Sequence, residues 1–198
     1  MKQNSRTRLL EVTARLLREQ GYAATTLSQI LEQSQTSRSS LYFLFPEGKS
    51  ELARAAIREQ HNQLMRGLQR LQVRYPYAGQ GIPALFHYFG REMEGNDYLK
   101  GSALAAVTLG VPDQSVQGEV SRCYRELTQF LRAWLAHSGM PAAQAAGRAQ
   151  LPVILLEGAL LLCKAHRSSD PLKQAINQLG FEPFRAVHSA CQASSTEG

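Results

Sequence analysis

Cysteine is scarce in this chain of 198 residues, which contains only three. Cys123, Cys163 and Cys191 are odd in number, lie far apart and form no Cys-x-x-Cys pair. This pattern argues against a disulfide framework and against a structural zinc site. Because free thiols are typical of reducing compartments, the sequence predicts a cytoplasmic protein. We expect it to use no metal and no other cofactor.

The chain also lacks a long uninterrupted apolar run. Its most apolar stretch, residues 151–163, is broken by Pro152 and Glu157 and is shorter than the roughly 20 residues that a membrane span needs. Residues 1–6 contain no continuous apolar signal core. The sequence therefore predicts no membrane partner. The net charge of +6 suits a polyanionic partner, although many unrelated soluble proteins are equally basic.

Catalytic motifs are missing as well. The five histidines are scattered without metal-ligand spacing, and no serine lies in a Gly-x-Ser-x-Gly segment. Gly48-Lys49-Ser50 resembles the end of a nucleotide-binding loop, but that motif needs a glycine where this chain has Phe43. The sequence thus predicts a protein that is not an enzyme.

Helical periodicity extends along almost the whole chain. Apolar residues recur at helical spacing, and no stretch alternates well enough to predict a strand, so we predict an all-α fold. Gly21 is placed to end the first helix, and residues 75–81 form a turn-rich break. Apart from two short helices considered next, the expected helices cover residues 5–20, 49 into the low seventies, 82–94, 102–109, 114–137, 142–166 and 171–190.

Two helix N-caps lie close together near the N-terminus. Thr26 with Gln29 fits a capping box, in which the threonine oxygen accepts from a backbone amide and the glutamine side chain reaches back. Ser37 provides a second N-cap a few residues after the first short helix must end, near Ser34. Two caps at this spacing indicate a helix-turn-helix. The second helix exposes residue types that bond to base edges and phosphates: Arg38, Ser39, Ser40 and Tyr42.

Residues around these caps recur together in one family of regulators. They are Gly21-Tyr22, Thr25-Thr26-Leu27, Ile30, Ser37, Leu41-Tyr42, Phe45, Lys49 and Glu51-Leu52. On these residues the segment 6–52 resembles the DNA-binding domain of the tetracycline-repressor (TetR) family of bacterial transcriptional regulators. The turn from Phe45 to Lys49 resembles a subgroup with one extra residue before the lysine.

Three positions depart from the usual pattern of that family. Gln35 stands in place of a turn glycine, Thr36 in place of an apolar residue and Leu44 in place of a frequent histidine. A glutamine at this turn argues against a left-handed backbone there, since glycine adopts that conformation most readily. The angle between the two short helices is therefore expected to differ slightly.

The resemblance implies a homodimer with about nine helices per chain and two domains. Residues 1–52 would form the helix-turn-helix DNA-binding domain, and residues 53–198 would form the effector-binding and dimerisation domain. By position, Thr26, Tyr42 and Lys49 would contact phosphates of a double-stranded DNA operator. On the recognition helix, which Ser37 opens, the residues expected to face bases are Arg38, Ser39 and Phe43.

Each of these residues also has a plainer interpretation. Thr26 acts as a cap in any case, and Arg38 is a surface arginine if it does not reach DNA. Phe43 is equally compatible with a core position. Tyr42 can bury its ring while its hydroxyl reaches a phosphate, so both interpretations hold together.

The C-terminal part contains a mixed set of side chains suited to line an apolar cavity with a few polar groups. For any single member, an ordinary core position is the alternative. The predicted ligand-binding residues are Phe86, Phe89, Met93, Leu104, Val107, Tyr124, Phe130, Trp134, Leu155 and Glu157. Because an unpaired buried carboxylate is costly, Glu157 is either exposed, paired or in the pocket. Leucine and alanine stripes after Leu151 are consistent with packing against a second copy.

These expectations together describe a ligand-responsive transcriptional regulator. We favour a repressor that a small apolar effector releases from a palindromic operator. The alternative is a helical module that binds proteins or sequesters a ligand and has lost useful DNA affinity. An enzyme ranks third, because no catalytic constellation supports it.

Overall fold

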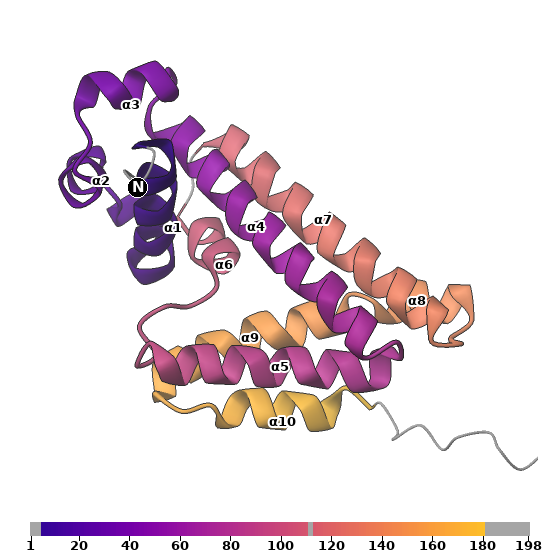
Figure 1. Cartoon of the computed structure of the whole chain (residues 1–198). Coiled ribbons are helices and arrows are strands. Elements are labelled where there is room, and N and C mark those ends of the chain that lie inside the picture. The colour runs from indigo at the N-terminus through magenta and orange to yellow at the C-terminus, as the bar shows by residue number, and fades with distance from the viewer. Residues whose placement is uncertain (1–4, 111–112, 181–198) are drawn as a thin grey trace, which may run out of the picture.

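The computed structural model describes residues 5–110 and 113–180, and these residues form helices without any strand (Figure 1). The helices are α1 Ser5–Ala24, α2 Leu27–Ser34, α3 Arg38–Leu44, α4 Lys49–Arg74, α5 Ala78–Gly95, α6 Ala103–Thr108, α7 Gln114–His137, α8 Ala142–Arg148, α9 Leu151–His166 and α10 Asp170–Gln178. The prediction of an all-α fold is confirmed. If α8 and α9 are counted as one kinked helix, the described part also has the nine helices expected.

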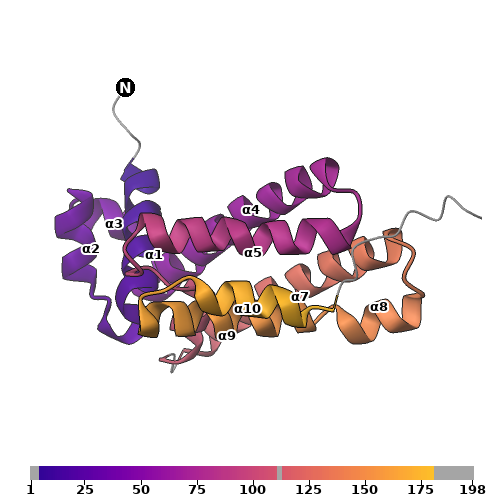
Figure 2. The same ribbon diagram turned by 90° about the horizontal axis from the view of Figure 1, so that it is seen from below.

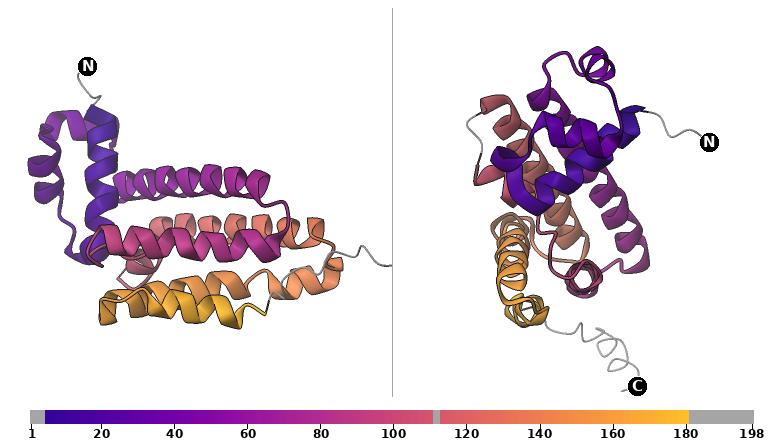
Figure 3. Two further views of the ribbon diagram at one scale, coloured as in Figure 1. Left: turned by 60° about the horizontal axis from the view of Figure 1, so that its bottom comes forward. Right: turned by 90° about the vertical axis from the view of Figure 1, so that its left-hand side faces the viewer.

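The first three helices pack around an apolar cluster of their own at one end of the elongated molecule (Figure 3). Leu9 of α1, Ile30 of α2 and Leu41 of α3 meet there and are fully buried. Gly21 has φ 78° and ψ 177°, so the backbone leaves the helical conformation at the glycine that was expected to stop α1. The Thr25 hydroxyl donates to the Gly21 carbonyl at 2.7 Å and fixes the turn toward α2.

Both predicted caps of the helix-turn-helix are present. Thr26 Oγ1 accepts from the Gln29 amide at 3.2 Å, and Gln29 Oε1 accepts from the Thr26 amide at 3.0 Å. Ser37 Oγ accepts from the Ser40 amide at 3.2 Å and starts α3. These local bonds determine where the two short helices begin.

The expectation for Gln35 was wrong. Gln35 ends α2 in the left-handed conformation, with φ 51° and ψ 43°. This conformation costs a non-glycine residue about 1–2 kcal/mol. Two bonds to the last turn of α2 offset the cost, because the amides of Gln35 and Thr36 donate to carbonyls of Glu32 and Leu31 at 3.2 and 3.1 Å.

α4 connects the N-terminal helices to the rest of the molecule (Figure 1). Its first turns contribute Leu52 to the N-terminal cluster, whereas Leu68 belongs to the larger C-terminal core. α4 packs against α1 and lies alongside α7. The domain boundary expected between residues 52 and 53 therefore lies inside one continuous helix.

The C-terminal helices α5, α9 and α10 lie side by side, with α7 packed against α4 and α8 (Figure 2). Trp134 of α7 is completely buried in their core, and its Nε1 donates to the Pro76 carbonyl at 2.9 Å. Gly81 of α5 lies directly beneath this ring, since a Cβ there would be 2.1 Å from Cζ2 of Trp134. Only glycine fits at this contact.

Several predicted helices have different bounds in the structure. α5 begins at Ala78, inside the predicted break, where the Ala78 amide donates to Ser138 Oγ at 2.7 Å. The predicted helix over residues 142–166 is interrupted between Arg148 and Leu151. The last predicted helix, over residues 171–190, is observed as α10, which begins at Asp170 and ends at Gln178. The predicted part beyond residue 180 lies outside the described residues.

By length and composition alone, residues 142–166 are apolar enough to cross a membrane. Core helices of soluble proteins pass the same test. Here one face of α9 packs into the C-terminal core through Val153, Leu156 and Leu160, which are buried. This packing accounts for part of the apolar character of the segment.

Candidate DNA-binding surface and effector cavity

α3 lies at the outer end of the N-terminal unit (Figure 1). Most of its side chains are exposed. Leu41 points inward and is fully buried, whereas Arg38 and Ser39 are exposed. Phe43 has 85% of its surface exposed and Tyr42 has 44%. The structure thus places Phe43 outside the core. Its ring is therefore accessible to a partner.

The hydroxyl groups at the two helix starts are held by local bonds. The Thr26 hydroxyl donates to Gln29 Oε1 at 3.1 Å, and the Ser37 hydroxyl lies 3.0 Å from that of Ser39. Thr26, Ser37 and Ser39 are nevertheless exposed, so their oxygen atoms remain accessible to a partner. The expected cap roles are present whether or not DNA binds.

Lys49 occupies the first position of α4 but does not point freely into solvent. Its Nζ lies 4.3 Å from the centre of the Tyr22 ring, a cation–π contact. Partial burial lowers the pKa of the Lys49 ammonium. The preceding Gly48 has φ 68°, and a Cβ there would lie 3.4 Å from Cε1 of Tyr42. Lys49 and the Tyr42 ring are therefore held close to the start of α4.

A cavity of about 1040 Å³ lies in the C-terminal part, between α4 and segments of α5, α6, α7 and α9. Its interior is mainly apolar and includes Leu64 and Leu68 of α4, Leu85 of α5, and Leu156 and Leu160 of α9. This volume lies at the upper end of the range for drug-sized ligands, roughly 300–1,000 Å³.

Glu157 is the less exposed of two acidic residues that line this cavity, the other being Glu92. Its Oε1 accepts from the Ser102 hydroxyl at 2.9 Å and from the Tyr124 hydroxyl at 3.0 Å. Burial raises the pKa of the Glu157 carboxyl, and the two hydrogen bonds oppose this rise. Burial and the neighbouring Glu157 charge likewise raise the pKa of Tyr124. Of the three possibilities for Glu157, the structure combines two, since the residue is both hydrogen-bonded and at the cavity.

The other predicted ligand-binding residues divide into two groups. Phe89 and Leu104 line this cavity with Glu157, Tyr124 reaches it through its bond to Glu157, and Phe86 lines a small neighbouring cavity of about 160 Å³. Neither described cavity is lined by Met93, Val107, Phe130, Trp134 or Leu155. Trp134 in particular lies in solid core, where it contacts Phe130 edge to face.

Sequence reasoning missed the contribution of α4, which provides one wall of the cavity. His61 is the most notable omission, because it is buried and its Nε2 lies 2.9 Å from Oε2 of Glu126. Helical spacing could have identified His61, since it lies on one helical face with Ile57, Leu64 and Leu68. A histidine on such a face must find a partner on another helix.

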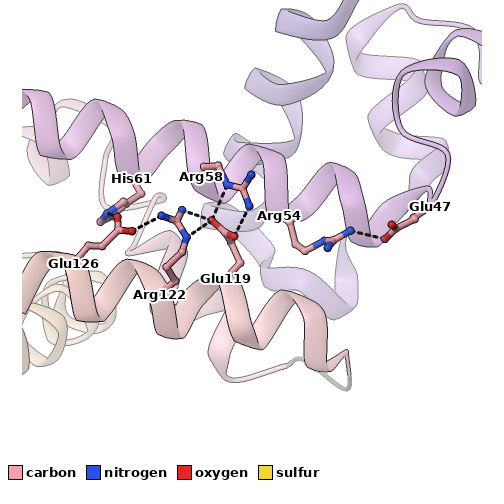
Figure 4. Close-up of polar contacts among 7 residues, drawn as sticks. All are labelled: Glu47, Arg54, Arg58, His61, Glu119, Arg122 and Glu126. Carbon is pink, nitrogen blue, oxygen red and sulfur yellow. Dashed lines mark hydrogen bonds and ion pairs between the residues drawn. The ribbon is translucent and has the colours of Figure 1, made fainter.

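His61 belongs to a chain of polar contacts between α4 and α7 (Figure 4). Arg58 Nη2 lies 2.7 Å from Oε2 of Glu119, and Arg122 bridges Glu119 and Glu126. Burial opposes ionisation of Glu119, but hydrogen bonds and charge from Arg58 and Arg122 hold its pKa at about 2. The network joins α4 to α7 by charge as well as by apolar contact.

The described structure therefore combines an exposed, capped recognition helix with a second helical part that contains a partly open cavity. This combination defines a helix-turn-helix transcriptional regulator. Residues 9–56 match the family described as bacterial regulatory proteins, tetR family. Residues 78–178 match the C-terminal domain of LmrA/YxaF-like transcriptional regulators. The chain belongs to the TetR family of DNA-binding transcriptional regulators.

Relatives of known sequence cover nearly the whole chain. The chain is 25% identical over 171 residues to the HTH-type transcriptional regulator LmrA of Bacillus subtilis. The matched region covers 85% of this chain and 91% of LmrA. It is 23% identical over 178 residues to the uncharacterized HTH-type transcriptional regulator YxaF of the same organism, covering 89% and 93%. Both parts of the chain are thus found together in these relatives.

Solved structures share the fold at lower identity. A regulatory protein TetR from Rhodobacter sphaeroides has a TM-score of 0.81 and 17% identity, with 89% of this chain and 97% of that protein covered. A cysteine mutant of the TetR family regulator CifR, complexed with a 26-base-pair double-stranded operator, has a TM-score of 0.76 and 19% identity, with coverage of 87% and 93%. At these identities the likeness concerns the fold alone.

Proposed function

We propose that this protein is a cytoplasmic repressor that a small, mainly apolar effector releases from its DNA operator. The observation that carries the proposal is α4, which starts beside the recognition helix and then forms one wall of the cavity. A ligand can change operator affinity only if it binds one conformation better than another. A displacement of α4 at the cavity would move its N-terminal turns and the helix-turn-helix packed against them.

For DNA recognition we propose that Arg38, Ser39 and Phe43 face the bases. Their exposure on α3 supports this assignment, because a helix placed in the major groove reads base edges with its outward side chains. An arginine forms two hydrogen bonds to guanine, and an exposed phenyl ring contacts thymine methyl groups. Ser37 would act mainly as the cap that orients this helix.

Thr26, Tyr42 and Lys49 would contact phosphates. The N-cap of α4 is Gly48, which provides no side-chain cap, so the first amides of the helix are available to an anion. The turn from Phe45 to Lys49 resembles a subgroup with one extra residue before the lysine. This extra residue would determine where α4 begins relative to α3. Lys49 would leave the Tyr22 ring to reach a phosphate. A direct ion pair with the phosphate would offset the loss of the cation–π contact.

Homodimers are typical of the TetR family, and we propose a dimer formed through α9. Ile154, Leu161 and Leu162 are 59%, 60% and 47% exposed, and Gly158 lies exposed between them. Their spacing places them on one helical face, opposite the face that packs into the core. An exposed apolar face of this kind marks an interface. A two-fold dimer would present two copies of α3 to a palindromic operator.

A salt titration of DNA affinity tests the proposal. An operator selected from a random pool is compared with a scrambled duplex by fluorescence anisotropy. Arg38→Ala should cost about 1–3 kcal/mol on the operator and much less on the scrambled duplex. Lys49→Ala should weaken both and reduce the salt slope by about one. Arg70→Ala, a change at an exposed position of α4 away from α3, is the control.

Two results would contradict the proposal. Equal losses of Arg38→Ala on both duplexes would reject its role in reading bases. If the wild-type protein binds no duplex with a measurable salt dependence, the protein is instead a module that sequesters its ligand.

A further inference from the structure

Two buried polar atoms at the cavity have no hydrogen-bond partner among the described residues. They are Nδ1 of His61 on α4 and Oε2 of Glu157 on α9. Both residues line the same cavity. Because buried polar atoms in proteins are nearly always hydrogen-bonded, unpaired atoms at a cavity indicate the chemistry of the molecule that binds there.

The hydrogen bond of His61 determines what its second nitrogen can do. The His61 side chain is 1% exposed, and its Nε2 is paired with the Glu126 carboxylate at 2.9 Å (Figure 4). An ionised carboxylate can only accept, so the ring proton lies on Nε2. In the neutral imidazole, Nδ1 is then an acceptor. A ligand that meets the neutral ring at this point must donate a hydrogen bond, and a hydroxyl group can also accept one from the protonated ring.

Glu157 presents a different requirement. Its Oε1 already accepts from Ser102 and Tyr124, which leaves Oε2 for a ligand. When ionised, Glu157 needs a donor at Oε2, whereas a protonated Oε2 needs an acceptor. A hydroxyl group satisfies both states, because it donates and accepts. An ammonium group satisfies only the first state, and a carbonyl group only the second.

The charge around the cavity disfavours a cationic ligand. Its lining contains Arg18, Arg66, Arg70, Arg74 and Arg91 but only two carboxylates, Glu92 and Glu157. A positive field of this kind lowers the local concentration of cations. The lining also offers leucine side chains of α4 and α9, which suit an apolar body.

We propose that the effector is an uncharged molecule with an apolar body and two hydroxyl groups, one bonded to Nδ1 of His61 and the other to Oε2 of Glu157. The inference rests on the proposed function and names the chemistry of its effector. A molecule bonded at both ends joins α4 to α9. His61 also belongs to the contacts between α4 and α7, so occupation of the cavity acts on the helix that carries the DNA-binding unit.

Calorimetric titration with three compounds on one skeleton tests this chemistry. The compounds are biphenyl with two hydroxymethyl groups, its dimethyl ether, and the corresponding bis(aminomethyl) compound. The diol should bind the full-length protein, and the ether, which cannot donate, should bind at least about tenfold more weakly. The diamine should bind more weakly than the diol.

Variants then locate the two hydroxyl groups. His61→Phe and Glu157→Leu should each reduce the ratio of diol to ether affinity by about threefold to tenfold. Glu157→Gln keeps an acceptor and a donor and should retain the preference for the diol. His87→Phe, a change at an exposed histidine that also lines the cavity, should retain it as well. Thermal unfolding of each variant verifies that it is folded.

The inference is overturned if none of the three compounds binds, if the ether or the diamine binds as tightly as the diol, or if either variant keeps the wild-type ratio. Operator release is measured separately by anisotropy. Diol selectivity without release would contradict the proposed function and leave the cavity chemistry standing. Release by a compound that lacks hydroxyl groups would contradict the cavity chemistry alone.

Discussion

Replacement of Gly81 by alanine should destabilise the protein although alanine favours helices. Gly81 lies within α5, and a Cβ there would be 2.1 Å and 2.3 Å from Cζ2 and Cη2 of Trp134. Carbon atoms in contact are normally about 3.5 Å apart, so the ring or the helix must move by more than about 1 Å. Trp134 is completely buried, which leaves no free space for the ring to enter.

The magnitude follows from three contributions. Overpacking of a dense core costs about 1–3 kcal/mol. Movement of the ring away from the Pro76 carbonyl leaves a buried indole N–H unpaired, which costs about 1–3 kcal/mol more. The higher helix propensity of alanine returns about 1 kcal/mol. We expect a net loss of about 1–5 kcal/mol, a large part of the total of about 5–15 kcal/mol typical of a folded domain.

Urea unfolding at one fixed protein concentration measures this loss, because association makes stability depend on concentration. Trp134 is the only tryptophan, so its fluorescence reports unfolding of this core, and circular dichroism serves as a second probe. Gly118→Ala is the matched control, since Gly118 is exposed within α7 and a Cβ there meets nothing within 4 Å. This control should gain about 0.5–1 kcal/mol. If Gly81→Ala is as stable as Gly118→Ala, the argument from close packing is refuted.

Three further outcomes are expected. Leu161→Glu should convert a dimer of about twice the 21.9 kDa chain into monomer in sedimentation, because it places a charge on the exposed α9 face. Val73→Glu, at a still more exposed position of α4, should remain dimeric, and a wild-type monomer at micromolar concentration would contradict the interface. The stability advantage of wild type over Glu119→Gln should be full above pH 4.5 and disappear as the pH falls toward 2, because the pKa of Glu119 in the folded protein, about 2, lies below the ordinary 4.5. A stability difference that stays constant over this pH range in thermal unfolding would refute this expectation. Thr26→Ala should lower the free energy of unfolding by about 1 kcal/mol through loss of the capping box, whereas Thr26→Ser should retain most of it.

Features determined by neighbouring residues were predictable from the sequence. The caps at Thr26 and Ser37 and the stop at Gly21 each depend on bonds within a few residues. Helix periodicity is similarly local, so most helices were expected at nearly their observed positions. The conformation of Gln35 was not predictable in this way, because the bonds that hold it compete with a propensity that favours glycine.

Features determined by distant residues could not be predicted. The start of α5 depends on Ser138 and Trp134, which are more than fifty residues further along the chain. The residues that line the cavity were equally hard to predict, because the sequence does not distinguish an apolar residue in a pocket from one in the core. Glu157 was recognisable since a carboxylate inside an apolar run needs a partner, whereas His61 became significant only when Glu126 of α7 was placed beside it.

The continuity of α4 has a consequence for protein engineering. A helix turns by about 100° and advances by about 1.5 Å per residue. Insertion of a single residue after Ile57 would therefore rotate the operator-reading end about the helix axis relative to the residues after the insertion, among them Arg58 and His61, which contact α7. Chimeras that join the DNA-reading part of this protein to the sensor of a relative must keep the helical register of α4 across the junction. Evolution of new operator and effector pairs in this chain is subject to the same constraint, since substitutions preserve that register and insertions within the helix do not.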